Sequence, residues 1–361
     1  MKWIQKWIAE QWNKEGIAYS KTTYLYATIV WFAVGLLPLF GYPAPFSGNK
    51  GILHLGILIL IVLFLIIATC IIIFFVKRNK NDIIANATKM FKKEKYQDIL
   101  TLRRRWSRFL WIEGKLFERL KLGEIAKKAA INLEKNKDLT EIYIDDLGWT
   151  NVPIDCNKAK GILESGLECA KKINNNDDKN YWIARAKRHL AGIELENMEY
   201  GQADILINDA ISFANNIVEE QRKKEMLAGI YHMKAFKTLK TSGQDKEKIE
   251  KALEYAKKSK ELCSERDKIR YIRIYSLEGC IYEVKGDINR AEQLYRTGLK
   301  ESKDLGRIDE IIKNSFGLAR ISDDEKEQRQ HLRKAEKLLK KTPVSYLIDE
   351  KEIRLMKYNI F

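Results

Sequence analysis

The densest group of basic side chains lies at Arg103-Arg104-Arg105-Trp106-Ser107-Arg108. Guanidinium groups bind phosphate oxygens through paired N–H bonds, so this cluster could contact lipid headgroups or a nucleic-acid backbone. Aromatic and apolar side chains at Trp106 and residues 109–111 indicate an amphipathic helix. A third interpretation is therefore a docking helix whose arginines only face solvent. Arg103, Arg104 and Arg105 are retained as candidate headgroup contacts.

The sequence contains none of the phosphate-loop, zinc-protease or nucleophile-elbow motifs GxxxxGK[ST], HExxH and GxSxG. Its five cysteines and four histidines stand apart, without the spacing of a metal site or a CxxC pair. The acidic pairs Asp145-Asp146 and Asp323-Asp324 are interpreted as helix caps or solvated side chains. We therefore expect no catalytic residues, no metal, no cofactor and no enzymatic activity.

The charge of the 361-residue chain is unevenly distributed. The formal net charge is +16, of which residues 1–76 carry +3 and the remainder +13. A mixed but basic surface fits a helical domain close to anionic lipid; the alternative is that the charge only keeps the domain soluble. Nucleic acid is disfavoured as a partner if the chain is held at a membrane.

A long apolar stretch at residues 52–76 carries no formal charge over 25 residues. As a helix it would extend about 37 Å, which exceeds the roughly 30 Å hydrocarbon core of a bilayer. Residues 22–40 form a second uncharged stretch, and the proline-rich residues 41–48 between them predict a tight turn. The sequence thus predicts a two-helix transmembrane hairpin over residues 22–76. A cleaved signal peptide is the alternative.

Lysines flank both ends of this hairpin, whereas its turn region contains only Lys50. The positive-inside rule then places both termini in the cytoplasm and the protein in the inner, cytoplasmic membrane with two spans. Within residues 1–21, tryptophans recur at helical spacing between lysines, which predicts an interfacial helix unless they pack on the soluble domain. The candidate headgroup contacts are Trp3, Trp7, Lys77, Arg78, Lys80, Arg103, Arg104 and Arg105.

Beyond the hairpin, apolar residues recur at helical spacing, and one segment carries a repeat motif. Its residues are Gly279, Tyr282, Gly286-Asp287, Ala291, Tyr295 and Gly298. This pattern resembles the tetratricopeptide repeat, a helix–turn–helix unit in which small residues allow close helix approach. Weaker copies occur around Ala191, Leu147, Ala235 and Phe316, spaced by about 40–44 residues instead of the family's 34.

The predicted fold class is therefore all-α, with an N-terminal transmembrane hairpin followed by an α-solenoid. Residues 77–114 are expected to form basic lead-in helices, and residues 115–361 the repeat domain, similar to those of bacterial signalling and effector-associated proteins. The resemblance implies a concave face that binds peptides, unless these positions form an ordinary solvated face. The candidate groove residues that it implies are Arg185, Arg188, His232, Arg273, Ser276, Cys280 and Glu283.

These features predict a membrane-anchored scaffold or adaptor that binds a protein partner at the cytoplasmic face, with anionic lipids beneath it. One alternative is a membrane effector of bacterial immune type, in which the helical domain senses a signal or oligomerises and the hairpins disrupt the bilayer. Another is a subunit or assembly factor of a membrane complex. Copies of the same chain are a further candidate partner.

Overall fold

The computed structural model describes residues 83–264 and 268–340. These residues are helical throughout and include no strand, which confirms the all-α prediction for this part of the chain. The chain divides into two compact units, residues 1–86 and 87–361, and nearly all of the described helices belong to the second. No helix among the described residues is long and apolar enough to cross a membrane. The predicted hairpin, the interfacial helix and Trp3, Trp7, Lys77, Arg78 and Lys80 lie outside the described residues.

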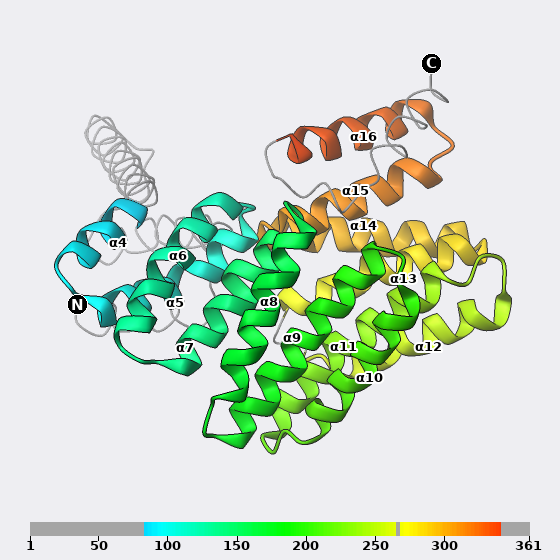
Figure 1. Ribbon diagram of the computed structural model, residues 1–361. Coiled ribbons are helices and arrows are strands. Elements are labelled where there is room, and N and C mark those ends of the chain that lie inside the picture. Colours follow the sequence, from blue (N-terminus) through cyan, green and yellow to red (C-terminus); the bar gives the residue numbers. More distant parts are fainter. Residues whose placement is uncertain (1–82, 265–267, 341–361) are drawn as a thin grey trace, which may run out of the picture. The chain divides into compact units, whose positions relative to one another are not determined.

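The helices follow one another with short connections (Figure 1). They are α4 (Ile83–Lys92), α5 (Tyr96–Ile112), α6 (Leu116–Asn132), α7 (Asn136–Glu141), the π-helix η2 (Ile142–Trp149), α8 (Cys156–Lys171), α9 (Asn176–Glu196), α10 (Tyr200–Asn215), α11 (Glu220–Lys240), α12 (Lys246–Leu262), α13 (Lys268–Lys285), α14 (Ile288–Leu305), α15 (Ile308–Ile321) and α16 (Glu325–Leu339).

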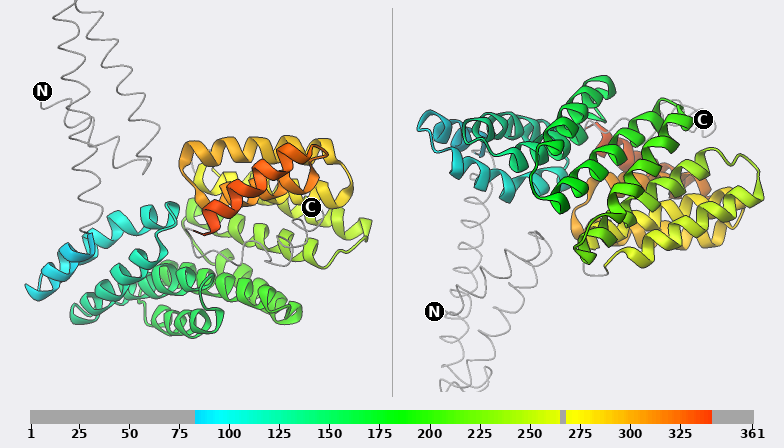
Figure 2. Two further views of the ribbon diagram at one scale, coloured as in Figure 1. Left: turned by 90° about the horizontal axis from the view of Figure 1, so that it is seen from above. Right: turned by 60° about the horizontal axis from the view of Figure 1, so that its bottom comes forward.

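From α5 onward the helices pack in pairs, and successive pairs stack in chain order (Figures 1 and 2). The first helices of the pairs begin at residues 96, 136, 176, 220, 268 and 308. Successive pairs thus begin 40 to 48 residues apart, and each forms one unit of a solenoid-like fold. The helix α5, expected to be a lead-in element, pairs with α6 in the same manner as the later helices.

Side-chain caps and one glycine fix several of the turns between consecutive helices. Asp155, Asn175, Asp245, Asp287 and Asp324 each accept a hydrogen bond from a backbone N–H in the first turn of the following helix. Such caps satisfy donors that have no intrahelical partner. Before α14, Gly286 has φ of +87°, a conformation that other residues rarely adopt. The Gly286-Asp287 motif therefore forms a turn, and Asp287 also caps α14.

Small residues lie where paired helices approach most closely. The ring of Tyr295, fully buried on α14, packs between Gly279 of α13 and Gly317 of α15. A methyl group added at Gly279 would lie 2.6 Å from Cε1 of that ring, and one at Gly317 would lie 2.5 Å from it. Gly148 packs against Leu163 in the same way. The small and aromatic residues of the repeat pattern thus set the helix spacing.

The first and last helix pairs also meet each other. Leu116, at the start of α6, is 2% exposed and belongs to one buried cluster with Ile312, Phe316 and Ala319 of α15. Trp111 of α5 packs against the same cluster. Elements far apart in sequence are therefore joined by apolar contacts. The row of helices curves until its two ends touch, and it encloses a central hollow.

Candidate functional site: an arginine-lined hollow

The central hollow has a volume of about 530 Å³, and its walls come mainly from the first helix of each pair. Side chains of α5, η2, α9, α11 and α13 all reach it. Ten arginines line it: Arg103, Arg104, Arg108, Arg119, Arg185, Arg188, Arg222, Arg270, Arg273 and Arg307. The volume falls in the range of small-molecule sites, which is about 300–1,000 Å³.

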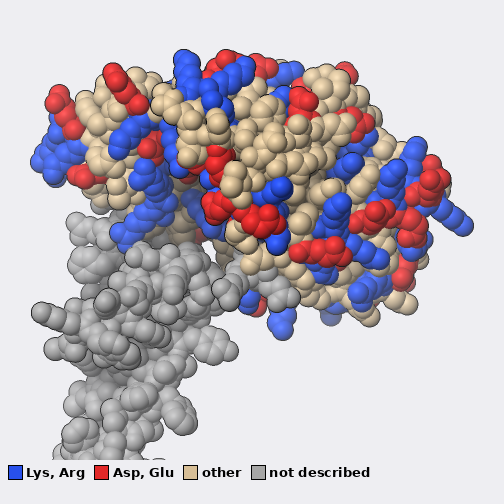
Figure 3. Space-filling model, turned by 90° about the horizontal axis from the view of Figure 1, so that it is seen from below, with Lys and Arg blue, Asp and Glu red and all other residues tan. Residues whose placement is uncertain are grey.

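The composition of this lining differs from that of the chain as a whole. The sequence has 46 lysines and 19 arginines, yet no lysine is among the described residues that line the hollow. The lining carboxylates are Glu141, Asp145 and Asp146. On the outer face drawn in Figure 3, basic and acidic side chains are interspersed, and no single-sign patch dominates the described part. Arginine is thus concentrated in the hollow, while lysine serves the outer surface.

The π-helix η2 places two acidic side chains at this site. Asp146 is fully buried and accepts hydrogen bonds from Nε of Arg103, from Oγ of Ser107 at 2.5 Å and from Nη2 of Arg119 at 3.3 Å. π-Helical turns are rare and occur often at functional sites. The interpretation of Asp145-Asp146 as caps or solvated residues is wrong, because both carboxylates are enclosed by arginines from other helices.

Asp145, the neighbour of Asp146, faces α9. It accepts a hydrogen bond from Nε of Arg185 at 2.6 Å, and Nε2 of His189 lies 3.7 Å away, beyond hydrogen-bond distance. Burial favours the neutral carboxyl and so raises its pKa. The interactions with Arg185 and His189 outweigh burial and hold the pKa of Asp145 well below its ordinary value. Asp145 is therefore a permanent anion that orients Arg185.

His189 is 3% exposed and stacks on Trp149, with ring centroids 4.4 Å apart. Neither ring nitrogen has a hydrogen-bond partner among the described residues. Burial, together with the charges of Arg188 and Arg185, lowers the pKa of His189 to about 3, although Asp145 opposes the shift. Burial also lowers the pKa of His232, with Arg273 as the largest charge contribution. Both rings stay neutral at physiological pH.

Most of the arginines in the hollow are held by carboxylates. Arg222 pairs with Asp177 and Asp178 at 3.0 Å, and Arg270 pairs with Glu225 at 2.6 Å. Arg307, which precedes α15, pairs with Asp309 at 2.5 Å and donates to the Ile269 carbonyl. The Arg222 and Arg270 pairs and the bond from Arg307 to Ile269 link neighbouring repeats, and all of these contacts fix the orientation of the guanidinium groups.

Arg188 differs from these arginines. Among the residues that the structure describes, it has no hydrogen-bond acceptor and no ion-pair partner. Its guanidinium lies across Gly229 of α11, where the first carbon of any side chain would overlap Nη1. Burial, followed by the like charges of Arg185, Arg273 and Arg270, lowers the pKa of Arg188 to about 9. Arg188 is therefore a cation without a counter-ion among the described residues.

No protein-family model matches the sequence, and no curated protein matches it either. Function is therefore inferred from the chemistry of the hollow.

The seven candidate groove residues fall into two groups. Arg185, Arg188, His232 and Arg273 lie together in the hollow. Ser276, Cys280 and Glu283 lie farther along α13 and contact the next repeat. Ser276 donates to Glu310, and Glu283 accepts from Arg320. The Tyr295 hydroxyl lies 2.6 Å from Glu283 and 3.2 Å from Sγ of Cys280, so its one proton can be donated to either. These three therefore join helices instead of facing a ligand.

The candidate headgroup residues of α5 have different environments. Arg103 is 2% exposed and is paired with Asp146 and Glu141, so it belongs to the interior. Arg104 is exposed and pairs with Asp138 at 2.6 Å, and Arg105 lies over the ring of Trp106 at 6.0 Å. Sequence reasoning missed the roles of Arg119, Asp146 and Trp149 in the hollow. No motif marks them, because they converge only through the packing of repeats.

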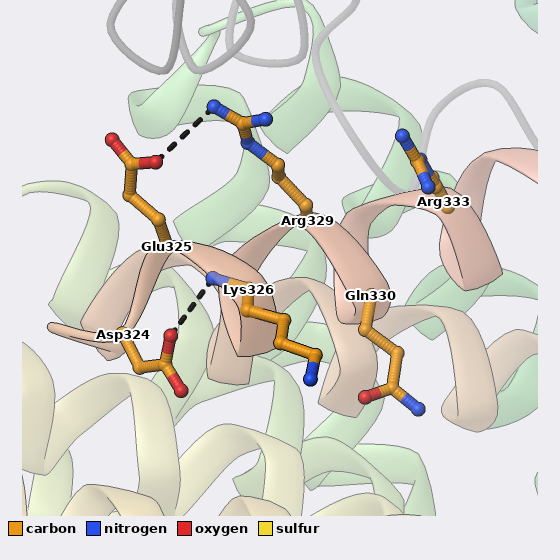
Figure 4. A pocket seen from close by; sticks show the side chains of 6 residues that line it. All are labelled: Asp324, Glu325, Lys326, Arg329, Gln330 and Arg333. Atoms are coloured by element: carbon orange, nitrogen blue, oxygen red, sulfur yellow. Dashed lines mark hydrogen bonds and ion pairs between the residues drawn. The ribbon is translucent and has the colours of Figure 1, made fainter.

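A second hollow, of about 720 Å³, runs along α16 (Figure 4). Its described lining comes from this one helix: Asp324, Glu325, Lys326, Arg329, Gln330 and Arg333. Asp324 caps the helix by accepting from the Lys326 N–H at 2.8 Å, and Glu325 pairs with Arg329 at 3.2 Å. These contacts are local, and no second described helix completes a binding site there.

Proposed function

We propose that this protein is a non-enzymatic adaptor with tetratricopeptide-like repeats, anchored at the cytoplasmic membrane face, which recognises an acidic segment of a protein partner. The supporting observation is the convergence of ten arginines from successive repeats on one hollow. Guanidinium groups bind carboxylates in a fixed paired geometry, which suits recognition of acidic side chains or a C-terminal carboxylate. The repeat pattern at Gly279, Tyr295 and Gly298 supports the assignment to this type of solenoid.

Co-purification tests this proposal. The full chain, solubilised in mild detergent, should retrieve a specific partner, and the charge-removing variant Arg273→Gln should retrieve less of it. Arg290→Gln on α14 is a matched control, because Arg290 is exposed and lies outside the hollow. Retrieval of no specific partner, or equal retrieval by both variants, would contradict the adaptor function.

A second candidate function is a membrane effector whose helical domain senses a signal. The contact between the first and last repeats favours it, because a hollow that is closed by its own ends can respond to a ligand as a unit. Expression of the full chain while membrane potential is recorded distinguishes the two functions. The effector should depolarise the membrane once triggered, whereas the adaptor should leave the potential unchanged.

A further inference from the structure

We propose that the centre of the hollow is a binding site for a small phosphorylated molecule, whose phosphate group is held by Arg188 together with Arg185, Arg270 and Arg273. This inference uses the hollow described above but does not require a protein partner. It goes beyond the adaptor function because it names a soluble ligand and the chemical group that is bound. The four arginines come from α9 and α13, on different walls of the hollow.

Arg188 is the first element of the site. It is the arginine without a described counter-ion, and the charges of Arg185, Arg270 and Arg273 all act on it. Gly229 leaves the space in which its guanidinium lies. Like charges that are held together in a partly buried site destabilise the folded state unless an anion joins them. Arg185, Arg270 and Arg273 each have a carboxylate partner, so a bound anion would supply the partner that Arg188 lacks among the described residues.

The other polar groups around Arg188 provide fixed support. Asp145 orients Arg185, and Glu225 orients Arg270, so their guanidinium groups are positioned before a ligand arrives. The unpartnered ring nitrogens of His189 and the unpartnered Nε1 of Trp182 also lie in this lining, and both residues are more than nine-tenths buried. A neutral imidazole and an indole N–H can bind ligand oxygens or ester groups without adding charge.

The choice of phosphate over carboxylate follows from charge and geometry. A phosphate monoester carries close to two negative charges at neutral pH and offers three strong acceptor oxygens. It can therefore accept from several guanidinium groups at once, whereas a carboxylate has two oxygens and one charge. The absence of lysine from the described lining agrees with this preference, because arginine binds phosphate oxygens in pairs.

The choice of a small molecule over a phosphorylated chain follows from the closure of the repeats. Leu116 and Trp111 pack on Ile312 and Phe316, so the two ends of the solenoid are joined. The joined ends limit the room for a long chain, whereas a compact ligand fits a volume of about 530 Å³. The hollow therefore suits a sugar phosphate or a nucleotide, which would compete with the acidic segment of a protein partner for the same arginines.

Thermal unfolding and calorimetric titration of the full chain in mild detergent test the site. The probes are inorganic phosphate, pyrophosphate and ATP, each compared with sodium chloride at equal ionic strength, with citrate and with a phosphoserine peptide. We expect the phosphate probes to raise the unfolding temperature and to bind more tightly than citrate or the peptide. A ligand that binds only the folded state must stabilise it.

Arg188→Gln and Arg188→Lys supply the decisive comparison. Arg188→Gln should weaken phosphate binding at least tenfold, because one set of charged hydrogen bonds is lost. Without ligand it should unfold at the same or a higher temperature than the native chain, since it removes a cation that lacks a counter-ion. Arg188→Lys should bind with intermediate affinity, because it retains the charge but not the paired N–H groups. Arg290→Gln should behave as the native chain does.

Several outcomes would overturn the site. One is a native chain whose response to the phosphate probes does not exceed its response to sodium chloride. Another is an Arg188→Gln variant that binds phosphate as tightly as the native chain. A third is an Arg188→Gln variant that unfolds at a lower temperature than the native chain without ligand, which would show that Arg188 stabilises the fold. Tighter binding of citrate would assign the hollow to carboxylates, and tighter binding of the phosphoserine peptide would assign it to a protein. Each of these outcomes would overturn the phosphate site whether or not co-purification retrieves a partner.

Discussion

Asp146 shows how a single residue organises the arginines of the hollow. It is fully buried, and it receives hydrogen bonds from Arg103 and Arg119, which come from two different helices. Ser107 donates to the same carboxylate and in turn accepts from Nε of Arg119 at 3.0 Å. One carboxylate therefore bridges two buried cations, and its loss would leave Arg119 without a carboxylate partner and Arg103 with Glu141 alone.

We expect Asp146→Asn to lower the free energy of unfolding by about 3–5 kcal/mol, because it leaves buried arginine charges uncompensated. Glu292→Gln is the control, since Glu292 and its partner Arg296 have side chains that are 42% and 49% exposed. Loss of such a surface pair costs at most about 1 kcal/mol. Urea unfolding measures both values, and equal losses would contradict the neutralising role of Asp146.

His189 gives the hollow a dependence on pH. Its pKa is about 3 in the folded protein, where burial and the arginine charges act on it, whereas an unfolded histidine titrates near 6.5. Between these values only the unfolded chain binds the proton, so acidification favours unfolding. The expected loss is about 2 kcal/mol between pH 7 and pH 5 for this one residue.

The variant His189→Phe isolates this contribution, because it retains a ring against Trp149 but cannot titrate. Its free energy of unfolding should fall less steeply between pH 7 and pH 5 than that of the native chain. His232 contributes with the same sign in both proteins, and Asp145 titrates below this window. Parallel pH profiles of the two proteins would show that the pKa of His189 is the same in the folded and the unfolded chain, and would contradict this contribution.

At the scale of the elements, the helical structure and the repeat spacing could be predicted from the sequence. The residues that mark the repeat, Gly279, Tyr295 and Gly298, contact side chains or helices of the same or the next helix pair. The lining of the hollow could be predicted only in part. The repeat pattern places four lining residues on the inner face of the first helices: Arg185, Arg188, His232 and Arg273. It does not place Arg119 and Asp146 there. Asp146 lies on a π-helix, and a wider turn shifts which side chains share a face.

The small residues between helix pairs lead to a prediction at this scale. Gly279→Ala should lower the free energy of unfolding by about 1–3 kcal/mol, because its methyl group would meet the buried ring of Tyr295. Gly161→Ala on α8 is the control, since no atom lies within 4 Å of the position of its added carbon. That change should instead stabilise the helix by up to about 1 kcal/mol. If Gly161→Ala were equally destabilising, close packing would not be the reason for glycine at position 279.

At the scale of the whole described unit, the contact between its ends decides how enclosed the hollow is. Leu116 provides much of this contact and is 2% exposed, whereas the next residue, Phe117, is 54% exposed. Neither side chain lines the hollow. Substitutions at these two neighbours therefore separate the effect of closure from the effect of the binding residues.

Leu116→Ala should destabilise the protein by about 2–5 kcal/mol and should also weaken phosphate binding, although it removes no arginine. Phe117→Ala should alter both quantities little. Urea unfolding and calorimetric titration of the two variants provide the measurement. Native affinity in a destabilised Leu116→Ala would show that the hollow holds its ligand without help from the joined ends.

The separation of lysine from arginine also gives the two sides of the protein different reactivities. Acylating reagents that attack primary amines would modify the outer surface and spare the lining, where the described cations are all guanidinium groups. Dicarbonyl reagents that condense with guanidinium would reach the lining, and an occupant would protect it. A fluorescent ester could therefore mark the exterior while phenylglyoxal, followed by mass spectrometry, records whether the interior is filled.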